Sequence, residues 1–373
     1  MPQPKSLYIH IPYCRNICDY CSFPVFKGNI VPDTYIEALK SEWEMILKDH
    51  QFNPELETIY FGGGTPSLLN ENQLEELITY FTKWKNNNSI EITLEANPTS
   101  LLKSKIHFWK SLKINRISLG IQSLSDNTLK TLTRTHSSKL SKNSIQLLKE
   151  SEFPSFNLDV IFGVPGQSVK QFEEDLKYIL DQNPTHISAY ELTIEEGTPY
   201  AINNIKQGPE DDVIAMTEIL DKLTPQYGIL KYEISNYAKP GFESKHNINY
   251  WLNNSYFGLG SGAFSFINRT RSSNERNPQE YIQLIEQNKL ANVFEETLSD
   301  ENYARETLMT QLRTVKGINC SEFKTQTDYN PIDLIKGETE LFIENNLMTI
   351  SEGNIKLTAT GLKVANSILK NFI

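Results

Sequence analysis

Residues 7–21 read Leu7-Tyr-Ile-His-Ile-Pro-Tyr-Cys14-Arg-Asn-Ile-Cys18-Asp-Tyr-Cys21, and this stretch decides the fold. Its first part, residues 7–11, is apolar and β-branched, which predicts a buried strand. Three cysteines with the spacing CxxxCxxC follow at once, at the carboxyl end of that strand. Barrel-type α/β folds build their active sites at the carboxyl ends of their strands, so the cysteines stand where chemistry is expected.

Strand-like and helix-like segments alternate through the first two hundred residues. Six runs are typical of strands, at residues 7–11, 58–61, 90–94, 116–120, 158–162 and 187–192. Helical patterns lie at residues 33–47, 71–84, 138–149, 169–180 and 212–223. This alternation indicates parallel βαβ units. A complete TIM barrel needs eight units, so six predict an α/β fold with a partial (β/α)6 TIM-like barrel; an open sheet is the alternative.

The pattern changes towards the end of the chain. Residues 302–315, 332–345 and 361–369 have helical patterns, and residues 347–350 and 354–357 form a hairpin pattern around Glu352-Gly353. Helices followed by a small hairpin predict a C-terminal α+β domain of winged-helix-like type. We therefore expect three parts: the barrel with its site over residues 1–230, a connecting region over 231–299, and the winged-helix-like module over 300–373.

Charge and composition exclude several classes of function. The 373 residues include 36 basic and 46 acidic side chains, a net charge of −10, and no run of basic residues offsets it. We therefore expect no nucleic-acid partner and at most peripheral contact with membranes. The C-terminal module has 8 basic and 10 acidic residues, which argues against DNA binding. No signal-peptide pattern and no bilayer-length apolar stretch is present, which predicts a cytoplasmic protein without membrane insertion.

Three of the four cysteines are candidate metal ligands. They fall within eight residues of a chain without a secretion signal, which favours a metal or cluster site over disulfides. Structural zinc closes its site with four ligands, whereas three cysteines leave one iron of a [4Fe–4S] cubane open to a small chelating molecule. We therefore predict a [4Fe–4S] cluster on Cys14, Cys18 and Cys21; zinc with a distant fourth ligand and a chance spacing are the alternatives. Cys320 is expected to be a buried small hydrophobe.

Polar residues stand near the carboxyl ends of the other strands. Gly62-Gly63-Gly64-Thr65-Pro66 follows the second strand, and its amides can cradle a charged group, although a tight turn would also explain the glycines. Glu95, Gln122 and Asp159 belong to the next three strands, and Arg134 lies between the last two. Arginine can clamp a carboxylate, and acidic groups can hold an ammonium or hydroxyls, so the set suits a zwitterionic nucleoside. Each residue alone is equally well explained as a loop cap or a surface pair.

The cysteine spacing and these strand-end motifs together resemble the radical S-adenosylmethionine (SAM) superfamily. The resemblance implies that SAM chelates the open iron and that the reduced cluster cleaves SAM to a 5′-deoxyadenosyl radical. It also implies that the segment Gly63-Gly64-Thr65 contacts the SAM amino group. Tyr8 in the first strand and Tyr20 among the cysteines are expected to pack around the cluster or SAM, with ordinary core packing as the alternative.

Further segments narrow the resemblance to the oxygen-independent coproporphyrinogen III oxidase group. They span nearly the whole chain and include residues 8–12, 62–67, 95–98, 118–123, 162–166 and 189–193. The group has an oxidase branch, which decarboxylates coproporphyrinogen III in porphyrin biosynthesis, and a heme chaperone branch, HemW. The oxidase branch has a further cysteine where this chain has Phe23, and an extension before the cysteines where this chain has thirteen residues. The segment His246-Asn-Ile-Asn-Tyr250-Trp251 also resembles the HNxxYW signature of the chaperone branch.

The resemblance to the chaperone branch implies heme as a ligand and an unidentified heme-acceptor protein as partner. His246 is expected to be the axial ligand of heme iron, because neutral imidazole binds iron well. Tyr250 and Trp251 are expected to stack on the porphyrin. A histidine that caps a turn, with Trp251 in the core, is the alternative.

Three functions remain open on the sequence alone. The first is a heme chaperone that binds heme, carries a SAM-ligated [4Fe–4S] cluster and passes heme to an acceptor; no catalytic residue is assigned to it. The second is a radical SAM coproporphyrinogen III dehydrogenase supplied by an electron donor. The third is a radical enzyme with another substrate. The sequence leaves open whether the protein is an enzyme, because its SAM motifs are complete.

Overall fold

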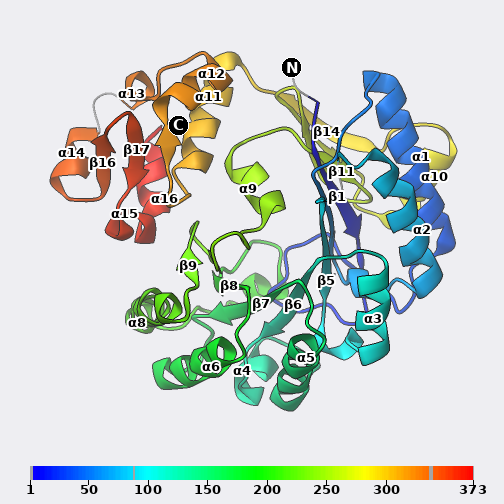
Figure 1. Ribbon diagram of the computed structural model, residues 1–373, viewed down its shortest axis with the longest axis horizontal. Helices are drawn as coiled ribbons and strands as arrows, with labels where there is room; N and C mark the ends of the chain where they lie inside the picture. Colours follow the sequence, from blue (N-terminus) through cyan, green and yellow to red (C-terminus); the bar gives the residue numbers. More distant parts are fainter. Residues whose placement is uncertain (1–2, 87–88, 336–338, 373) are drawn as a thin grey trace.

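A sheet of parallel strands forms the centre of the computed structural model, which describes residues 3–86, 89–335 and 339–372 (Figure 1). The six strands predicted from the sequence are all present and pair in chain order. They are β1 (Ser6–Ile11), β4 (Thr58–Gly63), β5 (Glu91–Ala96), β6 (Arg116–Gln122), β7 (Ser155–Phe162) and β8 (His186–Glu191). The sheet order is β11-β1-β4-β5-β6-β7-β8-β10-β9, and the predicted α/β partial barrel is confirmed.

Three short strands from later in the chain extend both edges of this sheet. β11 (Phe257–Leu259) pairs in parallel with β1, while β10 (Asn236–Ala238) pairs antiparallel with β8 and with β9 (Leu230–Lys231). Strands of two or three residues are too short for an alternation pattern to reveal them. The boundaries of the three predicted parts stay predictions.

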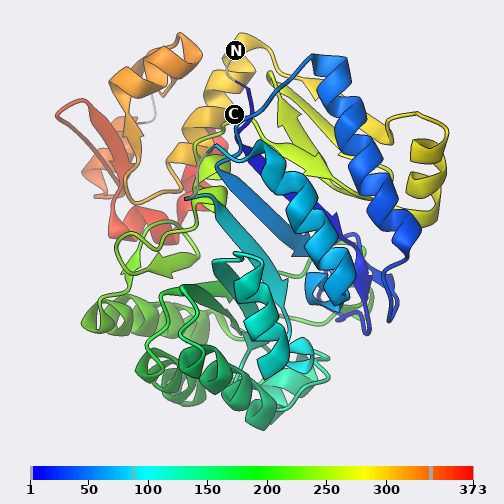
Figure 2. The same cartoon turned by 45° about the vertical axis from the view of Figure 1, so that its right-hand side comes forward.

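Helices cover the outer face of the curved sheet (Figures 1 and 2). They are α1 (Asp33–His50), α2 (Glu71–Phe81), α3 (Lys103–Ser111), α4 (Asp126–Thr131), α5 (Ser138–Glu150), α6 (Val169–Asp181) and α8 (Glu210–Leu223). Outward-facing strand residues such as Leu7, Ile59 and Leu119 are fully buried in the core beneath them. The sequence patterns do not predict α3 and α4, because each buries only two side chains and shows no clear apolar stripe.

Smaller elements flank the main sheet. A ribbon of β2 (Tyr13–Cys14) and β3 (Phe26–Lys27) holds the cysteine segment. An antiparallel sheet of β12 (Phe264–Ile267), β13 (Thr270–Asn274) and β14 (Asn292–Thr297) follows β11, and α10 (Pro278–Glu286) packs on α1. Among the described residues, no helix combines the length and the apolar character that crossing a bilayer requires.

The C-terminal module has a hydrophobic core of its own. Its elements are α11 (Asp300–Gln311), β15 (Ile318–Asn319), α12 (Cys320–Thr327), α13 (Pro331–Leu334), α14 (Thr339–Glu344), β16 (Met348–Ser351), β17 (Asn354–Leu357), α15 (Ala359–Lys363) and α16 (Ala365–Leu369). The predicted hairpin is present as β16 and β17, and Glu352 and Gly353 both have positive φ, as a tight hairpin turn requires.

Two predicted helices of this module differ from the structure. The helix predicted over 361–369 is two short helices, because the Thr358 side chain caps Gly361 N and starts α15 earlier, and Val364 then leaves helical geometry. The helix predicted over 332–345 includes residues 336–338, which lie outside the described residues; α13 and α14 stand on either side of them.

Glu42 of α1 is a buried carboxylate that joins three segments. It is 1% exposed and accepts hydrogen bonds from Gly260 N (2.9 Å), Tyr281 Oη (2.6 Å) and Asn274 Nδ2. Burial raises the pKa of Glu42 to about 7, and the three hydrogen bonds oppose that rise only in part. The carboxylate therefore holds α1 against α10 and against the segment after β11.

We expect Glu42 to destabilise the folded protein as the pH rises from about 5 to about 7. Its folded pKa of about 7 exceeds the ordinary 4.5, so the folded state binds an extra proton in this window and loses that advantage as the pH rises. Glu42→Gln should remove about 2 kcal/mol of this pH dependence, measured by urea unfolding at both ends of the window. Glu286→Gln, at an exposed position of α10, is the control. Identical pH profiles for wild type and Glu42→Gln would contradict this account.

Candidate functional site

The parallel strands turn polar side chains towards the inside of the partial barrel at alternate positions. The register aligns Ser118 of β6 with Asn157 of β7, and Asp159 of β7 with Ser188 of β8. Asp159 accepts hydrogen bonds from Ser118 Oγ (3.1 Å) and Asn157 Nδ2 (2.6 Å), and Asn157 Nδ2 also donates to Ser188 Oγ (2.9 Å). The interior is thus lined by a hydrogen-bonded polar layer, while the intervening apolar residues face the helices.

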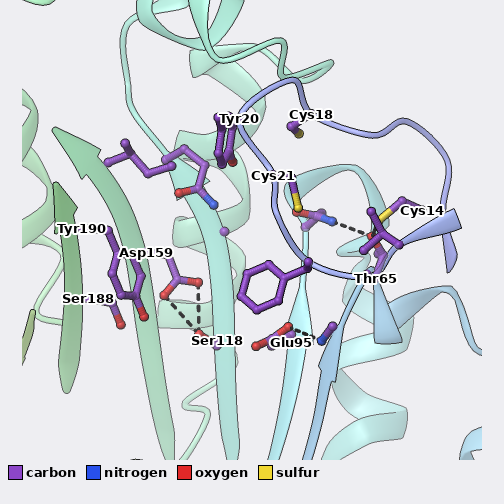
Figure 3. Close-up of a pocket in the computed structure, with 18 of the residues that line it drawn as sticks. Cys14, Cys18, Tyr20, Cys21, Thr65, Glu95, Ser118, Asp159, Ser188 and Tyr190 are labelled. Carbon is purple, nitrogen blue, oxygen red and sulfur yellow. Dashed lines mark hydrogen bonds between the residues drawn. The ribbon is translucent and has the colours of Figure 1, made fainter. Parts of the chain in front are cut away.

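A cavity of about 490 Å³ opens at the carboxyl ends of these strands (Figure 3). Cys14, Cys18 and Cys21 line one side of it, and Glu95 and Asp159 face them from the strands. Its volume lies within the range of small-molecule sites. The structure therefore brings the predicted cysteines and the predicted strand-end carboxylates to one place.

The three cysteines lie on one loop and all are free and partly buried. Cys21 N donates to Cys18 O (3.0 Å), and Cys14 Sγ lies 3.4 Å from Thr65 Oγ1 of the glycine segment. A Cβ on Gly64 would lie 2.8 Å from the backbone of this loop, so the two segments pack closely. Burial raises the pKa of the Cys14 thiol to about 11 and also raises the pKa of the Cys21 thiol. A bound metal would reverse this, because coordination deprotonates a thiol.

The loop offers the three thiols that an iron–sulfur cluster takes as ligands. Among the described residues, no group of three or more His, Cys, Asp or Glu side chains converges on one point where an ion could sit. A cubane does not require the three thiols to point at one ion position, because each cysteine binds a different iron. Three free thiols around the mouth of one cavity therefore suit Cys14, Cys18 and Cys21 as ligands of a [4Fe–4S] cluster.

Glu95 links the glycine segment to the barrel interior. It accepts hydrogen bonds from Gly63 N (3.1 Å) and Tyr60 Oη (2.8 Å), and burial raises its pKa to about 7. Gly63 has φ +109°, and a Cβ there would lie 2.4 Å from the His10 ring, so only glycine fits this bend. The buried carboxylate has no basic partner among the described residues, and a ligand ammonium would supply one.

Arg134, Gln122 and Tyr20 also line the cavity. Arg134 donates to Asn97 Oδ1 (2.5 Å) and Gly120 O (3.0 Å), and its Nη1 lies 3.5 Å from Cys18 Sγ. Gln122 has φ +63°, an uncommon conformation for a non-glycine residue that marks the end of β6. Arg134 therefore connects the cysteine loop, to which Tyr20 itself belongs, with the strand ends.

Tyr8 and His246 are not among the described residues that line the cavity. Tyr8 Oη is hydrogen-bonded to His10 Nδ1 (2.9 Å). His246 is 1% exposed; its Nδ1 is 2.7 Å from Thr58 Oγ1 and its Nε2 is 2.8 Å from Tyr250 Oη. Its ring stacks on Tyr60, with centroids 5.0 Å apart, and burial lowers the pKa of His246 to about 3. Both ring nitrogens of this neutral histidine are thus occupied.

Several lining residues were not singled out from the sequence. They are Asn97, Arg116, Asn157, Ser188 and Tyr190. A signal for most of them exists: polar residues at every second position of otherwise apolar strands, as in residues 155–162. Apolar, β-branched runs are enough to predict the strands, whereas the residues that face inward follow only from this alternation.

Comparisons with known proteins identify relatives over the whole chain. The family model described as the Radical SAM superfamily matches residues 8–179, and the HemN C-terminal domain model matches residues 298–364. The heme chaperone HemW of Bacillus subtilis (strain 168) is 34% identical over 378 residues, covering 99% of both chains. The heme chaperone HemW of Escherichia coli (strain K12) is 32% identical, covering 99% of this chain and 98% of the relative.

A solved structure is similar over the same extent. Coproporphyrinogen III oxidase (HemN) from Escherichia coli, described as a radical SAM enzyme, has a TM-score of 0.85 and 21% identity. The match covers 99% of this chain and 90% of that chain. At this identity the likeness shows the fold: a radical SAM barrel with a separate C-terminal domain.

Proposed function

We propose that this chain, which belongs to the heme chaperone HemW family of the radical SAM superfamily, binds heme and passes it to an acceptor protein. We propose further that it carries a SAM-ligated [4Fe–4S] cluster. The proposal that the protein binds a cluster and SAM rests on one observation. Three free cysteines of one loop face Glu95 and Asp159 across a single cavity. The names of the full-length relatives support the heme part. The free cysteines agree with action in the cytoplasm, where thiols stay reduced.

Different residues of the cavity would bind the cluster and SAM. Cys14, Cys18 and Cys21 would hold the cluster, which supplies one-electron chemistry on SAM when it is bound. Glu95 would take the SAM ammonium. The other predicted contacts, Gly63, Gly64, Thr65, Tyr20, Gln122, Arg134 and Asp159, line the same cavity. Asp159 offers carboxylate oxygens at a second point of the lining, where a ligand hydroxyl can donate.

Glu95→Gln should weaken SAM binding about 30-fold, because a charge-assisted hydrogen bond to an ammonium is worth about 2 kcal/mol. Since the pKa of Glu95 is about 7, SAM should also bind more tightly to the wild type as the pH rises through 7, when the carboxylate ionises. Equilibrium dialysis of SAM with reconstituted protein across this range measures both effects. Glu150→Gln, at an exposed position of α5, is the control. Equal affinities and pH profiles for Glu95→Gln and wild type would remove Glu95 from the SAM site.

His246 stays the proposed axial ligand of heme iron, but its hydrogen bonds must change before it can bind iron. Iron needs one free ring nitrogen, but Thr58 and Tyr250 engage both. Ligation therefore requires the bond to Thr58 or the bond to Tyr250 to break, and helix α9 (Lys245–Trp251), which carries His246, to move away from Tyr60. Tyr8, whose ring lies 6.4 Å from that of His246, belongs to the same cluster of rings.

A coproporphyrinogen III dehydrogenase is the second candidate, favoured by the completeness of the SAM site in the cavity. Phe23 argues against it: it is 63% exposed at the cavity mouth, at the position where the oxidase branch has a further cysteine. Anaerobically reconstituted protein with SAM, a reductant and coproporphyrinogen III should give no decarboxylated product, next to an authentic oxidase as positive control. Product formation by a sample with an intact cluster would establish the second candidate in place of the first.

A further inference from the structure

Tyr60 of β4 contacts two residues that the proposed function assigns to different ligands. Its side chain lines the cavity that contains the cysteines, and its Oη donates a hydrogen bond to Glu95 Oε1 (2.8 Å). Its ring stacks on the ring of His246, with centroids 5.0 Å apart and an interplanar angle of 29°. Tyr60 is thus a direct link between the carboxylate proposed for the SAM ammonium and the imidazole proposed for heme iron.

The positions of these residues on their strands explain why they meet. Thr58 and Tyr60 are two residues apart on β4, so they face the same side, and Thr58 Oγ1 lies 2.7 Å from His246 Nδ1. The register of β4 with β5 makes Glu95 a diagonal neighbour of Tyr60 on that face. A Cβ on Gly62 would lie 2.9 Å from the Tyr60 ring and 3.2 Å from Glu95 Oε1. Glycine at this position therefore leaves room for the contact between Tyr60 and Glu95.

The orientation of the Glu95 carboxylate depends on the Tyr60 side chain. One carboxylate oxygen accepts from Gly63 N (3.1 Å), which belongs to the backbone, and the other accepts from Tyr60 Oη. The Tyr60 ring is in turn held between neighbours, because it contacts the rings of Tyr8 (centroids 6.0 Å apart) and His246. A ring that loses one of these contacts is free to turn to other side-chain conformations. The hydrogen bond to Glu95 is therefore secured by the stacking of His246 on Tyr60.

Binding of iron by His246 would disturb this arrangement. Ligation requires the imidazole to give up a hydrogen bond and to leave the Tyr60 ring, since both of its nitrogens are engaged where it lies. Tyr60 would then lose a stacking partner, and its hydrogen bond to Glu95 would weaken. In the opposite direction, an ammonium bound to Glu95 would fix the carboxylate, and with it the Tyr60 ring against which His246 stacks. Each ligand thus favours the arrangement that the other must give up.

We infer that Tyr60 is a positioning residue that couples the two sites, so that heme on His246 and SAM on Glu95 each weaken the binding of the other. The inference rests on the proposed function, because it needs both ligands. Such coupling is reciprocal: the factor by which heme lowers the affinity for SAM equals the factor by which SAM lowers the affinity for heme. Binding of SAM would therefore favour release of heme from His246, which is the step that transfer to an acceptor requires.

The first test measures the dissociation constant of each ligand with and without the other, on the full-length chain reconstituted with its cluster. Equilibrium dialysis gives the constant for SAM, and absorption titration gives the constant for hemin. Each constant should rise at least about 5-fold when the other ligand is present, which is the low end for coupled sites. We call this factor the coupling ratio, and it should reach a plateau as the second ligand saturates. A hemin constant that rises without limit as SAM is added would mean direct competition and would overturn the inference.

Tyr60→Phe tests the link itself, because it keeps the ring and removes the hydroxyl that reaches Glu95. Its coupling ratio should fall below about 2-fold, whatever the change does to either affinity alone. Tyr281→Phe is the matched control: Tyr281 is also buried and also donates to a buried carboxylate, that of Glu42, but it is not among the described residues that line the cavity. It should keep the wild-type coupling ratio. An unchanged ratio in Tyr60→Phe, or an equal loss in Tyr281→Phe, would overturn the inference.

A second test needs no ligand. Urea unfolding of the cluster-free, full-length chain compares His246→Ala, Glu95→Gln and the double variant, each with Tyr60 and with Tyr60→Phe. Effects of independent sites add, whereas sites joined through a shared residue depart from additivity. The unfolding equilibrium constants should depart from additivity by at least about 3-fold with Tyr60 and by less than about 2-fold with Tyr60→Phe. Additivity in both backgrounds would overturn the inference, whereas a chain that takes up neither cluster nor hemin would refute the proposed function and leave this second test to decide on Tyr60.

Discussion

Protein reconstituted with iron and sulfide is expected to lose its iron–sulfur absorption when any one of Cys14, Cys18 and Cys21 is replaced by alanine. These three thiols are the only cysteines that line the cavity among the described residues, so each loss leaves an iron without a protein ligand. We expect bound iron and sulfide to fall to near background, measured by chemical analysis and by electron paramagnetic resonance of the reduced sample.

Cys320→Ala is the matched control for this prediction. Cys320 packs against the core of the C-terminal module and does not line the cavity. It should therefore keep wild-type iron and sulfide. Full iron and sulfide in any of the three loop variants would refute the assignment of that cysteine, and loss in Cys320→Ala would move the cluster elsewhere.

His246→Ala should lower the free energy of unfolding by about 3–5 kcal/mol. The substitution empties a buried site and leaves the Thr58 and Tyr250 hydroxyls without their partner. Urea unfolding followed by circular dichroism measures the loss. His107→Ala, at an exposed position of α3, should change stability by less than about 0.5 kcal/mol. A loss below about 1 kcal/mol for His246→Ala would mean that α9 is not held as the structure shows.

Tyr250→Phe separates this structural role from heme ligation. The change keeps the ring but removes the hydroxyl from His246 Nε2. If His246 binds heme iron through Nε2, the variant should bind heme at least as tightly as wild type, since one competing bond is gone. Heme titration followed by absorption checks this, and an unchanged heme spectrum in His246→Ala would exclude His246 as the ligand.

The main sheet could be predicted from the sequence because each of its six strands is long enough to show its pattern. The strands β9, β10 and β11 were missed because they have two or three residues and form only through pairing with distant segments. The division of residues 361–369 into two helices also escaped prediction, since it depends on the Thr358 cap.

The candidate site could be predicted where its residues follow a local rule. The cysteines have a fixed spacing, and Glu95 and Gln122 stand at strand ends, so all of them line the cavity as expected of such positions. No local rule predicts the surroundings of His246, because its contacts Thr58 and Tyr60 lie almost two hundred residues away in the sequence. Sequence alone cannot reveal that both of its nitrogens are engaged.

A titration of the reconstituted full-length protein with heme, followed by absorption and by gel filtration of the complex, tests the central claim most directly. The account predicts a saturable complex of one heme per chain that survives gel filtration and gives up its heme to an excess of an apo-heme protein. Heme that adds without saturation, or that separates from the protein on the column, would contradict a heme chaperone.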